Sequence, residues 1–559
     1  MHPSPVARAA VAAALLLPIA AHAAQQQPAA PPAPSAAPAP GAPVAVTIAG
    51  GPLAGRERYG VRVFRGIPYA QPPVGDLRWR APQPVAAWTT PRDASEFGPV
   101  CPQTDAVARA YGATLEPTSE DCLTLNVWTA ATSPRERRPV MVWIHGGSLT
   151  HGSGRVLIYD GTRFARGGVV LVTINYRLGA LGFLAHPALS AESPQGISGN
   201  YAFLDQVAAL RWVRENIAAF GGDPDNVTIF GESAGAYSVG YHLASPLSRG
   251  LFHKAILQSG SPFREVVPLR SASDSARSAE RVGTEFAKRV GAPPGAEGVR
   301  ALRSMPADSI ITLTATAQMG TFPETVDGWF LTEPPAVAVA RGRLAPVPIM
   351  IGSNADEATI LVRQVPVTTP EQFEALMRRT YPARADQLLA LYPTAGPDGA
   401  RRAYRQAWTD DVFGVTARET ARSFTRAGQR VYRYYYTRVA DGMTGLALGA
   451  FHASEIPFVF GVTRMSSPVW GRTAFDSTLG VAMNGYWTRF AATGDPNGVG
   501  AVPWPAFTVA DDGYLEFGAT IAAGRGLRAA QFDLLSSILG DRVALWERAS
   551  PPVRAGGSH

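Results

Sequence analysis

The sequence predicts an α/β protein, with a large, mostly parallel central sheet flanked by helices and with inserted helical cap regions. Short apolar runs rich in β-branched residues alternate with helical stretches over most of the chain, as in parallel strands joined by helices. The chain has 559 residues, of which 46% are hydrophobic, so a large core can form. No linker-like segment interrupts residues 44–548, and we therefore expect one large domain there.

Individual elements follow from composition and spacing. Apolar residues at helical spacing predict a helix over residues 201–217. Residues 262–346 and 373–391 have helical patterns and are expected to form the inserted cap. The expected strands are the apolar runs at residues 140–144, 169–176, 227–230, 254–258, 347–351 and 431–436.

A serine stands between two glycines in the run from Gly231 to Gly235, after a predicted strand and before a predicted helix. This strand–turn–helix context is the nucleophile elbow of the α/β-hydrolase fold, which holds Ser233 above the sheet edge. Glycine is needed because the turn is strained and bulk at its flanks would clash with the neighbouring strand and helix. The turn would leave the N–H of Ala234 free to face an oxyanion. The sequence therefore predicts Ser233 as a nucleophile.

A serine nucleophile needs a base within hydrogen-bond reach and a carboxylate that orients the base. In the α/β-hydrolase fold, the acid and then the histidine follow the serine along the chain. Of the nine histidines, only His452 lies far enough beyond Ser233 and outside the terminal segments. His452 is therefore the predicted base, and activity would rise with pH around the usual histidine pKa of about 6.5–7.

The acid should lie in a loop after a strand between Ser233 and His452. The run at 347–352 is the best strand in this interval, and Asp356 and Glu357 follow it closely. Spacing does not choose between these two carboxylates. A surface pair that caps the next helix is an equally good interpretation.

A glycine loop after an earlier strand is the expected position of an oxyanion hole. The apolar run 142–144 leads into His145, Gly146, Gly147 and Ser148. Glycine lets main-chain N–H groups approach a substrate carbonyl, and one such donor contributes about 2.7–4 kcal/mol. A phosphate-binding loop would need the lysine of the nucleotide motif, which is missing here.

The N-terminus predicts export. Residues 1–23 have a basic start, an apolar stretch and a small-x-small cleavage site, as in a signal peptide. An uncleaved anchor is the less favoured alternative, because the apolar stretch is too short to span a bilayer. Residues 24–43 are predicted to be a disordered Ala/Pro-rich linker, and residues 549–559 a disordered tail. We expect a periplasmic or extracellular protein without stable membrane insertion.

The two cysteines, Cys101 and Cys122, are expected to form a disulfide in an exported protein. A metal site is not expected from two sulfur atoms without a nearby histidine. The formal net charge of +7 comes almost wholly from scattered arginines, which favours surface ion pairs over a nucleic-acid partner.

With these motifs, the sequence resembles the type-B carboxylesterases, a family that includes bacterial para-nitrobenzyl esterases and animal cholinesterases. The matches begin with Phe-Arg-Gly-Ile-Pro-Tyr-Ala at residues 64–70 and continue with Ser-Glu-Asp-Cys-Leu-Thr-Leu-Asn-Val-Trp at residues 119–128. Further matching segments are residues 72–75, 175–177, 199–200, 205–206, 222–224 and 494–497. The resemblance thus covers nearly the whole predicted mature chain.

The resemblance implies a role for each site residue. The family's acid is the glutamate of an Asp-Glu pair, which selects Glu357, and its histidine precedes a Glu-Ile-Pro-Phe run, which selects His452. The implied oxyanion donors are the N–H groups of Gly147, Ser148 and Ala234. The implied disulfide joins Cys101 to Cys122. The implied activity is hydrolysis of small-molecule carboxylic esters through an acyl-enzyme, and no metal or organic cofactor is implied. The oligomeric state is not read from the sequence, and a monomer is the expectation.

Two departures from the family pattern bear on the substrate. Ser148 stands where glycine or alanine is usual, so a hydroxyl would line the pocket and small polar acyl groups would be tolerated. Cholinesterases hold the quaternary ammonium on a tryptophan within the disulfide loop, but Tyr111 is the only aromatic residue between the cysteines. A choline ester is therefore not expected. The alternatives are a hydrolase of amides, lactones or polyesters, or a non-catalytic binding protein on the same scaffold.

Overall fold

The computed structural model describes residues 41–549 except 106–116, 272, 274–275, 317–321, 363–366, 442 and 463–472. The strands are β1 (Ala42–Ile48), β2 (Gly51–Arg58), β3 (Val61–Pro68), β4 (Arg92–Asp93), β5 (Thr124–Thr129), β6 (Arg138–Ile144), β7 (Val170–Ile174), β8 (Gly222–Glu232), β9 (Lys254–Gln258), β10 (Val267–Pro268), β11 (Thr325–Val326), β12 (Ile349–Asn354), β13 (Val431–Tyr436), β14 (Gly513–Phe517) and β15 (Ile521–Arg525).

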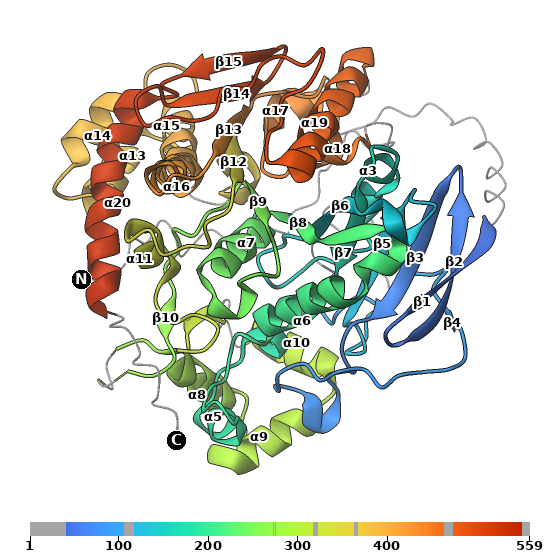
Figure 1. The fold of residues 1–559 in the computed structure, drawn as a ribbon. Helices are drawn as coiled ribbons and strands as arrows, with labels where there is room; N and C mark the ends of the chain where they lie inside the picture. Colours follow the sequence, from blue (N-terminus) through green and yellow to red (C-terminus); the bar gives the residue numbers. More distant parts are fainter. Residues whose placement is uncertain are drawn as a thin grey trace, which may run out of the picture.

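The helices, most of which are drawn in Figure 1, are α3 (Thr162–Arg166), α4 (Gly179–Phe183), α5 (Pro187–Glu192), α6 (Tyr201–Asn216), α7 (Ala234–Ala244), α8 (Ala279–Arg289), α9 (Gly295–Ser304), α10 (Ala307–Thr316), α11 (Pro335–Ala340), α12 (Ala358–Leu361), α13 (Pro370–Thr380), α14 (Ala385–Leu391), α15 (Gly399–Thr409), α16 (Val415–Arg426), α17 (Met443–Leu448), α18 (Ile456–Phe460), α19 (Ala474–Thr493) and α20 (Ala529–Ala549). A π-helix, Asp410–Gly414, joins α15 to α16.

One large sheet organises the described residues. Its strand order is β1-β2-β3-β5-β7-β6-β8-β9-β12-β13-β14-β15, with β4 beside β2. The central strands from β7 to β14 run parallel, whereas β1, β2, β3 and β5 form an antiparallel edge. The predicted α/β-hydrolase fold class is confirmed. The carboxyl ends of the parallel strands therefore meet at one edge, where ligand sites of such sheets lie.

The alternation of side chains along each central strand builds two cores, one on each face of the sheet. In β6, Val140, Val142 and Ile144 face the first core, while Met141 and Trp143 face the second. The first core is covered by α6, α7 and α16, and the second by α3, α18 and α19. Figure 1 shows α6 and α7 lying across the central strands, and α20 at the opposite end of the sheet from β1 and β2. The central strands have a nearly continuous apolar sequence because they are buried on both faces of the sheet.

Most predicted elements agree with the observed ones to within a few residues, but two predicted boundaries were wrong. The strand β1 begins at Ala42, inside the predicted linker, because its main chain pairs with β2 from Ala42 opposite Glu57 onward. The helix α20 continues to Ala549, one residue into the predicted tail. The predicted signal peptide, residues 1–23, and the rest of the linker and tail lie outside the described residues.

The predicted cap is helical, as expected, with one addition. Helices α8 to α11 occupy the region 262–346, and α13 and α14 occupy 373–391. The addition is a short parallel pair, β10 and β11, which brings Val267 beside Thr325. Among the described residues, no helix is both long and apolar enough to cross a membrane.

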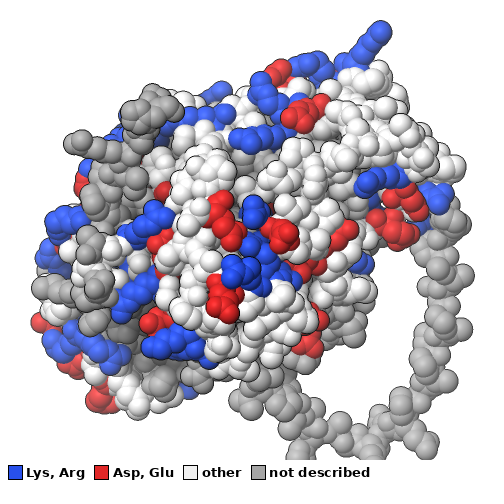
Figure 2. All heavy atoms as spheres, turned by 90° about the horizontal axis from the view of Figure 1, so that it is seen from below, with Lys and Arg blue, Asp and Glu red and all other residues white. Residues whose placement is uncertain are grey.

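Basic and acidic side chains are interspersed on the molecular face drawn in Figure 2. Ion pairs such as Arg303 with Glu192, at 2.9 Å, join opposite charges in the described chain. Basic side chains on that face therefore lie next to acidic ones and do not form a single large positive patch.

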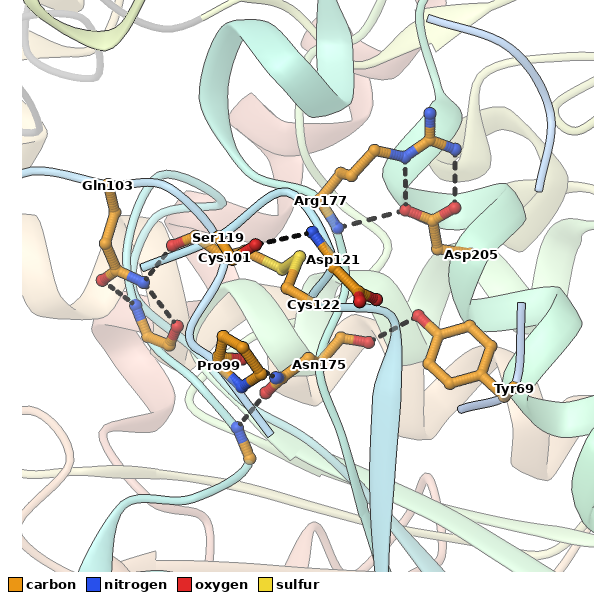
Figure 3. The surroundings of a disulfide bond; sticks show 12 residues. Tyr69, Pro99, Cys101, Gln103, Ser119, Asp121, Cys122, Asn175, Arg177 and Asp205 are labelled. Atoms are coloured by element: carbon orange, nitrogen blue, oxygen red, sulfur yellow. Dashed lines mark hydrogen bonds and ion pairs between the residues drawn. A yellow bond between two sulfur atoms is a disulfide. The ribbon is translucent and has the colours of Figure 1, made fainter. Parts of the chain in front are cut away.

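The disulfide between Cys101 and Cys122 is present, with an S–S distance of 2.03 Å. Figure 3 shows it surrounded by polar side chains that tie neighbouring loops together. The most buried of these is the pair of Arg177 and Asp205, in which Nη2 donates to Oδ1 at 2.6 Å and Nε to Oδ2 at 2.8 Å. Such a paired, bidentate arrangement is what allows two charges to be buried.

Replacing both cysteines by alanine is expected to lower the free energy of unfolding by about 3 kcal/mol, because closing a loop of this length restricts the unfolded chain. The measurement is urea unfolding under non-reducing conditions. Dithiothreitol should lower the midpoint of the native protein and leave that of the double variant unchanged. Equal midpoints for the two proteins without reductant would contradict the expectation.

Candidate active site

Ser233 occupies the turn between β8, which ends at Glu232, and α7, which begins at Ala234. Its φ of 56° lies in the left-handed region that non-glycine residues rarely adopt. A Cβ atom on Gly235 would come within 2.0 Å of the Ile144 carbonyl oxygen, and one on Gly231 within 2.6 Å of the Gly235 backbone. The strained turn and its two glycines thus have the geometry that the nucleophile elbow requires.

Glu357 and His452 form a buried hydrogen-bonded pair. The Nδ1 atom of His452 lies 2.5 Å from Oε2 of Glu357. The other carboxylate oxygen, Oε1, accepts the N–H of Asn354 at 2.8 Å, at the carboxyl end of β12. Glu357 is fully buried, so the interpretation as a surface pair is wrong. The carboxylate is held from both sides and can fix the imidazole in one orientation and tautomer.

Asp356 has a different position from its neighbour. Its Oδ2 accepts the N–H of Ala450 at 2.8 Å, and its own N–H donates to the Ala450 carbonyl at 3.0 Å. It also forms an isolated bridge with Phe451, the residue before His452. Asp356 therefore holds the backbone that carries His452, while Glu357 contacts the ring itself.

The second imidazole nitrogen faces a residue that the sequence did not suggest. The Nε2 atom of His452 lies 3.1 Å from Oε1 of Glu232, the residue directly before Ser233. Within the described residues, the Ser233 hydroxyl makes no hydrogen bond. The fold therefore brings the imidazole to the elbow, but in this conformation Nε2 points to Glu232 and not to the serine.

The predicted oxyanion loop lies directly beside Ser233. A Cβ atom on Gly146 would come within 3.2 Å of Cβ of Ser233. Gly147, Ser148 and Leu149 all have positive φ, at 102°, 57° and 60°. The loop is closed by N–H groups of residues 150 and 151, which both donate to the Gly147 carbonyl. Ser148 and Leu149 are two successive non-glycine residues at positive φ, and backbone strain of this kind clusters at functional sites.

Charges near His452 outweigh the effect of its burial. Burial disfavours the imidazolium, but the charges of Glu232 and Glu357 and the hydrogen bond to Glu357 raise the pKa of His452 above its ordinary value. Burial also raises the pKa of Glu232, against the opposing effect of His452. The expected titration of His452 therefore moves above the range of about 6.5–7 that the sequence suggested.

A polar network behind His452 was missed from the sequence. Glu455 accepts hydrogen bonds from Nε2 of Gln258 at 3.0 Å and from Nδ2 of Asn354 at 2.7 Å. Asn354 also donates from Nδ2 to the Phe451 carbonyl at 2.8 Å. Gln258 and Asn354 are the last residues of β9 and β12. Polar residues at the carboxyl ends of adjacent parallel strands were the signal that could have found them.

A metal-binding group is absent from the described residues, and a hollow found there lies away from the site. No group of three or more His, Cys, Asp or Glu side chains in the described chain could hold a metal ion. A hollow of about 340 Å³ is lined by residues that include Arg249, Phe252 and Val347. Phe252 and Val347 precede β9 and β12, so this hollow lies at the amino ends of the strands, away from Ser233.

Comparison with known proteins gives consistent matches. Residues 42–535 match the carboxylesterase family. The fumonisin B1 esterase of Sphingopyxis macrogoltabida is 38% identical over 477 residues, which are 84% of this chain and 85% of that protein. The para-nitrobenzyl esterase of Bacillus subtilis (strain 168) is 36% identical over 83% of this chain and 92% of its own. A solved PNB esterase structure has a TM-score of 0.75 and 32% identity, and the match covers 88% of this chain and 99% of that one.

Replacing Glu232 by glutamine is expected to lower the pKa of His452, because it removes a negative charge next to Nε2. The imidazolium would then lose its proton at lower pH than in the native protein. The measurement is NMR titration of protein labelled with ¹⁵N-histidine, and His452→Ala identifies the resonance. A pKa of His452 that is unchanged in E232Q would contradict this electrostatic account.

Proposed function

Because the chain belongs to the carboxylesterase family and is a carboxylic ester hydrolase, we propose that it cleaves small-molecule esters through an acyl-enzyme formed on Ser233. The observation that carries this proposal is the strained turn at Ser233 beside both the glycine loop and the His452–Glu357 pair. A nucleophile, a base with an orienting acid and free main-chain donors are the parts that acyl transfer requires.

In the first half-reaction, Nε2 of the neutral form of His452 accepts the hydroxyl proton of Ser233 while Oγ bonds to the ester carbonyl carbon. The carbonyl electron pair moves onto oxygen, and this oxyanion accepts hydrogen bonds from the N–H groups of Gly147, Ser148 and Ala234. The carbonyl re-forms, and the alcohol leaves with the proton from His452. Water then attacks the acyl-enzyme with His452 as the base, and the carboxylic acid is released.

This mechanism needs one local rearrangement, because Nε2 of His452 faces Glu232 in the described conformation. Catalytic hydrogen bonds are often formed only when substrate is bound. A small shift of the imidazole or of the Ser233 hydroxyl, with the Nδ1 contact to Glu357 kept, would bring Nε2 to the serine. Glu232 then remains next to the imidazolium and stabilises its charge during the reaction.

We also propose which esters are the substrates. Two relatives are named as esterases of fumonisin B1 and of para-nitrobenzyl esters, and a rabbit protein 35% identical to this chain is named cocaine esterase. These names differ in the ester concerned, so they do not identify the alcohol part of this protein's substrate. We infer that the substrates carry small polar acyl groups, because the hydroxyl of Ser148 would line the pocket at the oxyanion loop. Choline esters are not part of the proposal, although Tyr111, on which this rests, lies outside the described residues.

Export is the second part of the proposal. We infer that residues 1–23 are a cleaved signal peptide and that the mature protein acts in the periplasm or the medium. The disulfide supports this inference, because such bonds persist in oxidising compartments.

The variant Ser233→Ala is expected to lose para-nitrophenyl acetate hydrolysis by at least about 10⁴-fold, since no other group can form the acyl-enzyme. It should also lose covalent labelling by a fluorophosphonate. The matched control, Ser304→Ala, changes an exposed serine of α9 and should keep both. Labelling of the Ser233→Ala protein would overturn the proposal, and faster cleavage of a matched anilide than of the ester would favour an amidase.

The neighbouring carboxylates allow a matched test of the acid. Glu357→Gln should lower kcat by about 10³–10⁴-fold, because the amide no longer stabilises the correct imidazole tautomer or the imidazolium. Asp356→Asn keeps an oxygen that can accept the Ala450 N–H and should lower kcat by less than about tenfold. Steady-state kinetics of both variants decides the assignment, and an equal loss in the two would contradict it.

A further inference from the structure

The segment that leads into the disulfide is hydrogen-bonded to the far end of the oxyanion loop. The side-chain amide of Gln103 accepts the N–H of Gly152 at 2.8 Å and donates to the Gly152 carbonyl at 2.9 Å. The same Nε2 also donates to the Cys101 carbonyl at 3.1 Å. Figure 3 shows this amide beside the disulfide, with its bonds running to the neighbouring backbone. One side chain thus satisfies both main-chain groups of Gly152.

Gly152 in turn packs against the start of the same loop. Its φ is 108°, and a Cβ atom there would come within 2.4 Å of Nδ1 of His145 and 2.7 Å of the Gly146 carbonyl oxygen. Gly152 therefore packs directly against the peptide group that joins Gly146 to Gly147. Glycine can adopt such a φ because it lacks a Cβ atom, and for the same reason no side chain restricts its backbone to that φ. The position of Gly152 therefore depends on the groups that bind it.

Two further contacts join the same two segments. The Oγ1 atom of Thr104 lies 2.8 Å from Nε2 of His151. The amide of Asn175 accepts the Gly154 N–H at 2.8 Å and donates to the Pro99 carbonyl at 3.1 Å, as Figure 3 shows around its labelled residues. Hydrogen bonds therefore connect residues 151–154, at the end of the loop, to residues 99–104, in one case through Asn175.

We propose that Gln103 is a positioning residue for the oxyanion hole. Its amide fixes the Gly152 peptide groups and thereby holds the N–H groups of Gly147 and Ser148 toward the carbonyl oxygen of the substrate. This proposal rests on the proposed function, since it assigns a role within the same acyl transfer. The Gln103 amide is bonded to main-chain groups of Gly152 and Cys101, so its proposed effect is on the transition state through the loop and not on substrate binding.

The test replaces Gln103 by methionine, which has a similar length and no hydrogen-bonding amide. The matched control is Gln83→Met, because Gln83 is exposed and its amide donates to the nearby Ala81 carbonyl. Fluorophosphonate titration counts competent sites, and kcat is expressed per titrated site with para-nitrophenyl acetate. For Q103M we expect kcat to fall by about 10- to 100-fold. This decrease is no larger than the one caused by removing an oxyanion donor, because the donors are displaced and not lost. The KM should stay within about threefold of the native value. Q83M should match the native protein.

A second measurement separates positioning from general damage. A trifluoromethyl ketone forms a tetrahedral oxyanion on the serine, whereas the corresponding alcohol cannot. The inhibition constant of the ketone should rise in Q103M by the same factor by which kcat/KM falls, while that of the alcohol stays unchanged. If Q103M does not fold, Gln103→Glu serves in its place, because it keeps an acceptor for the Gly152 N–H and loses the donor.

The inference is overturned if kcat per titrated site and ketone inhibition in the variant stay within twofold of the native values. It is also overturned if KM alone rises, since Gln103 would then act in substrate binding. Failure of the proposed function gives a different result, in which the Ser233→Ala protein is still active or the native protein is not labelled. The two failures are therefore distinguishable.

Discussion

The site depends on how closely the turn at Ser233 packs on the end of β6. A methyl group on Gly235 would come within 2.0 Å of the Ile144 carbonyl oxygen, so the two segments touch through backbone alone. This contact lets the chain change from strand to helix at one residue and keeps Ser233 at a positive φ that the surroundings impose. The glycine loop after Ile144 is then necessarily beside the serine.

The same sheet edge concentrates buried charge. The carboxylates of Glu232, Glu357 and Glu455 lie around a single imidazole, that of His452, and all four side chains are buried. Burial raises the pKa of Glu232 and Glu455, while the carboxylate charges raise the pKa of His452. The outcome is an imidazole whose pKa lies above its ordinary value and which is held in place by Glu357 and by the backbone contacts of Asp356.

Sequence patterns located the central elements better than the edges. Strands β9 and β13 were predicted with their observed bounds, because strands buried on both faces leave a continuous apolar signature. Strands β1 to β3 were not predicted, since an antiparallel edge that is partly exposed carries arginine and glutamate as readily as apolar residues. The first residues of β1 even resemble the Ala/Pro-rich linker before them, and only pairing with β2 makes them a strand.

By itself, the sequence determined the kinds of chemical group present and their order along the chain: a serine flanked by glycines, an Asp-Glu pair and one eligible histidine. Only the tertiary structure decided that Glu357 faces the ring and Asp356 the backbone, that Glu232 lies against Nε2, and that Gln103 holds Gly152. These contacts join residues far apart along the chain: Glu357 and His452 are 95 positions apart, and Glu232 and His452 are farther apart still. Their geometry follows from strand register and loop path, which depend on the packing of the whole sheet and are not encoded in any local run of residues.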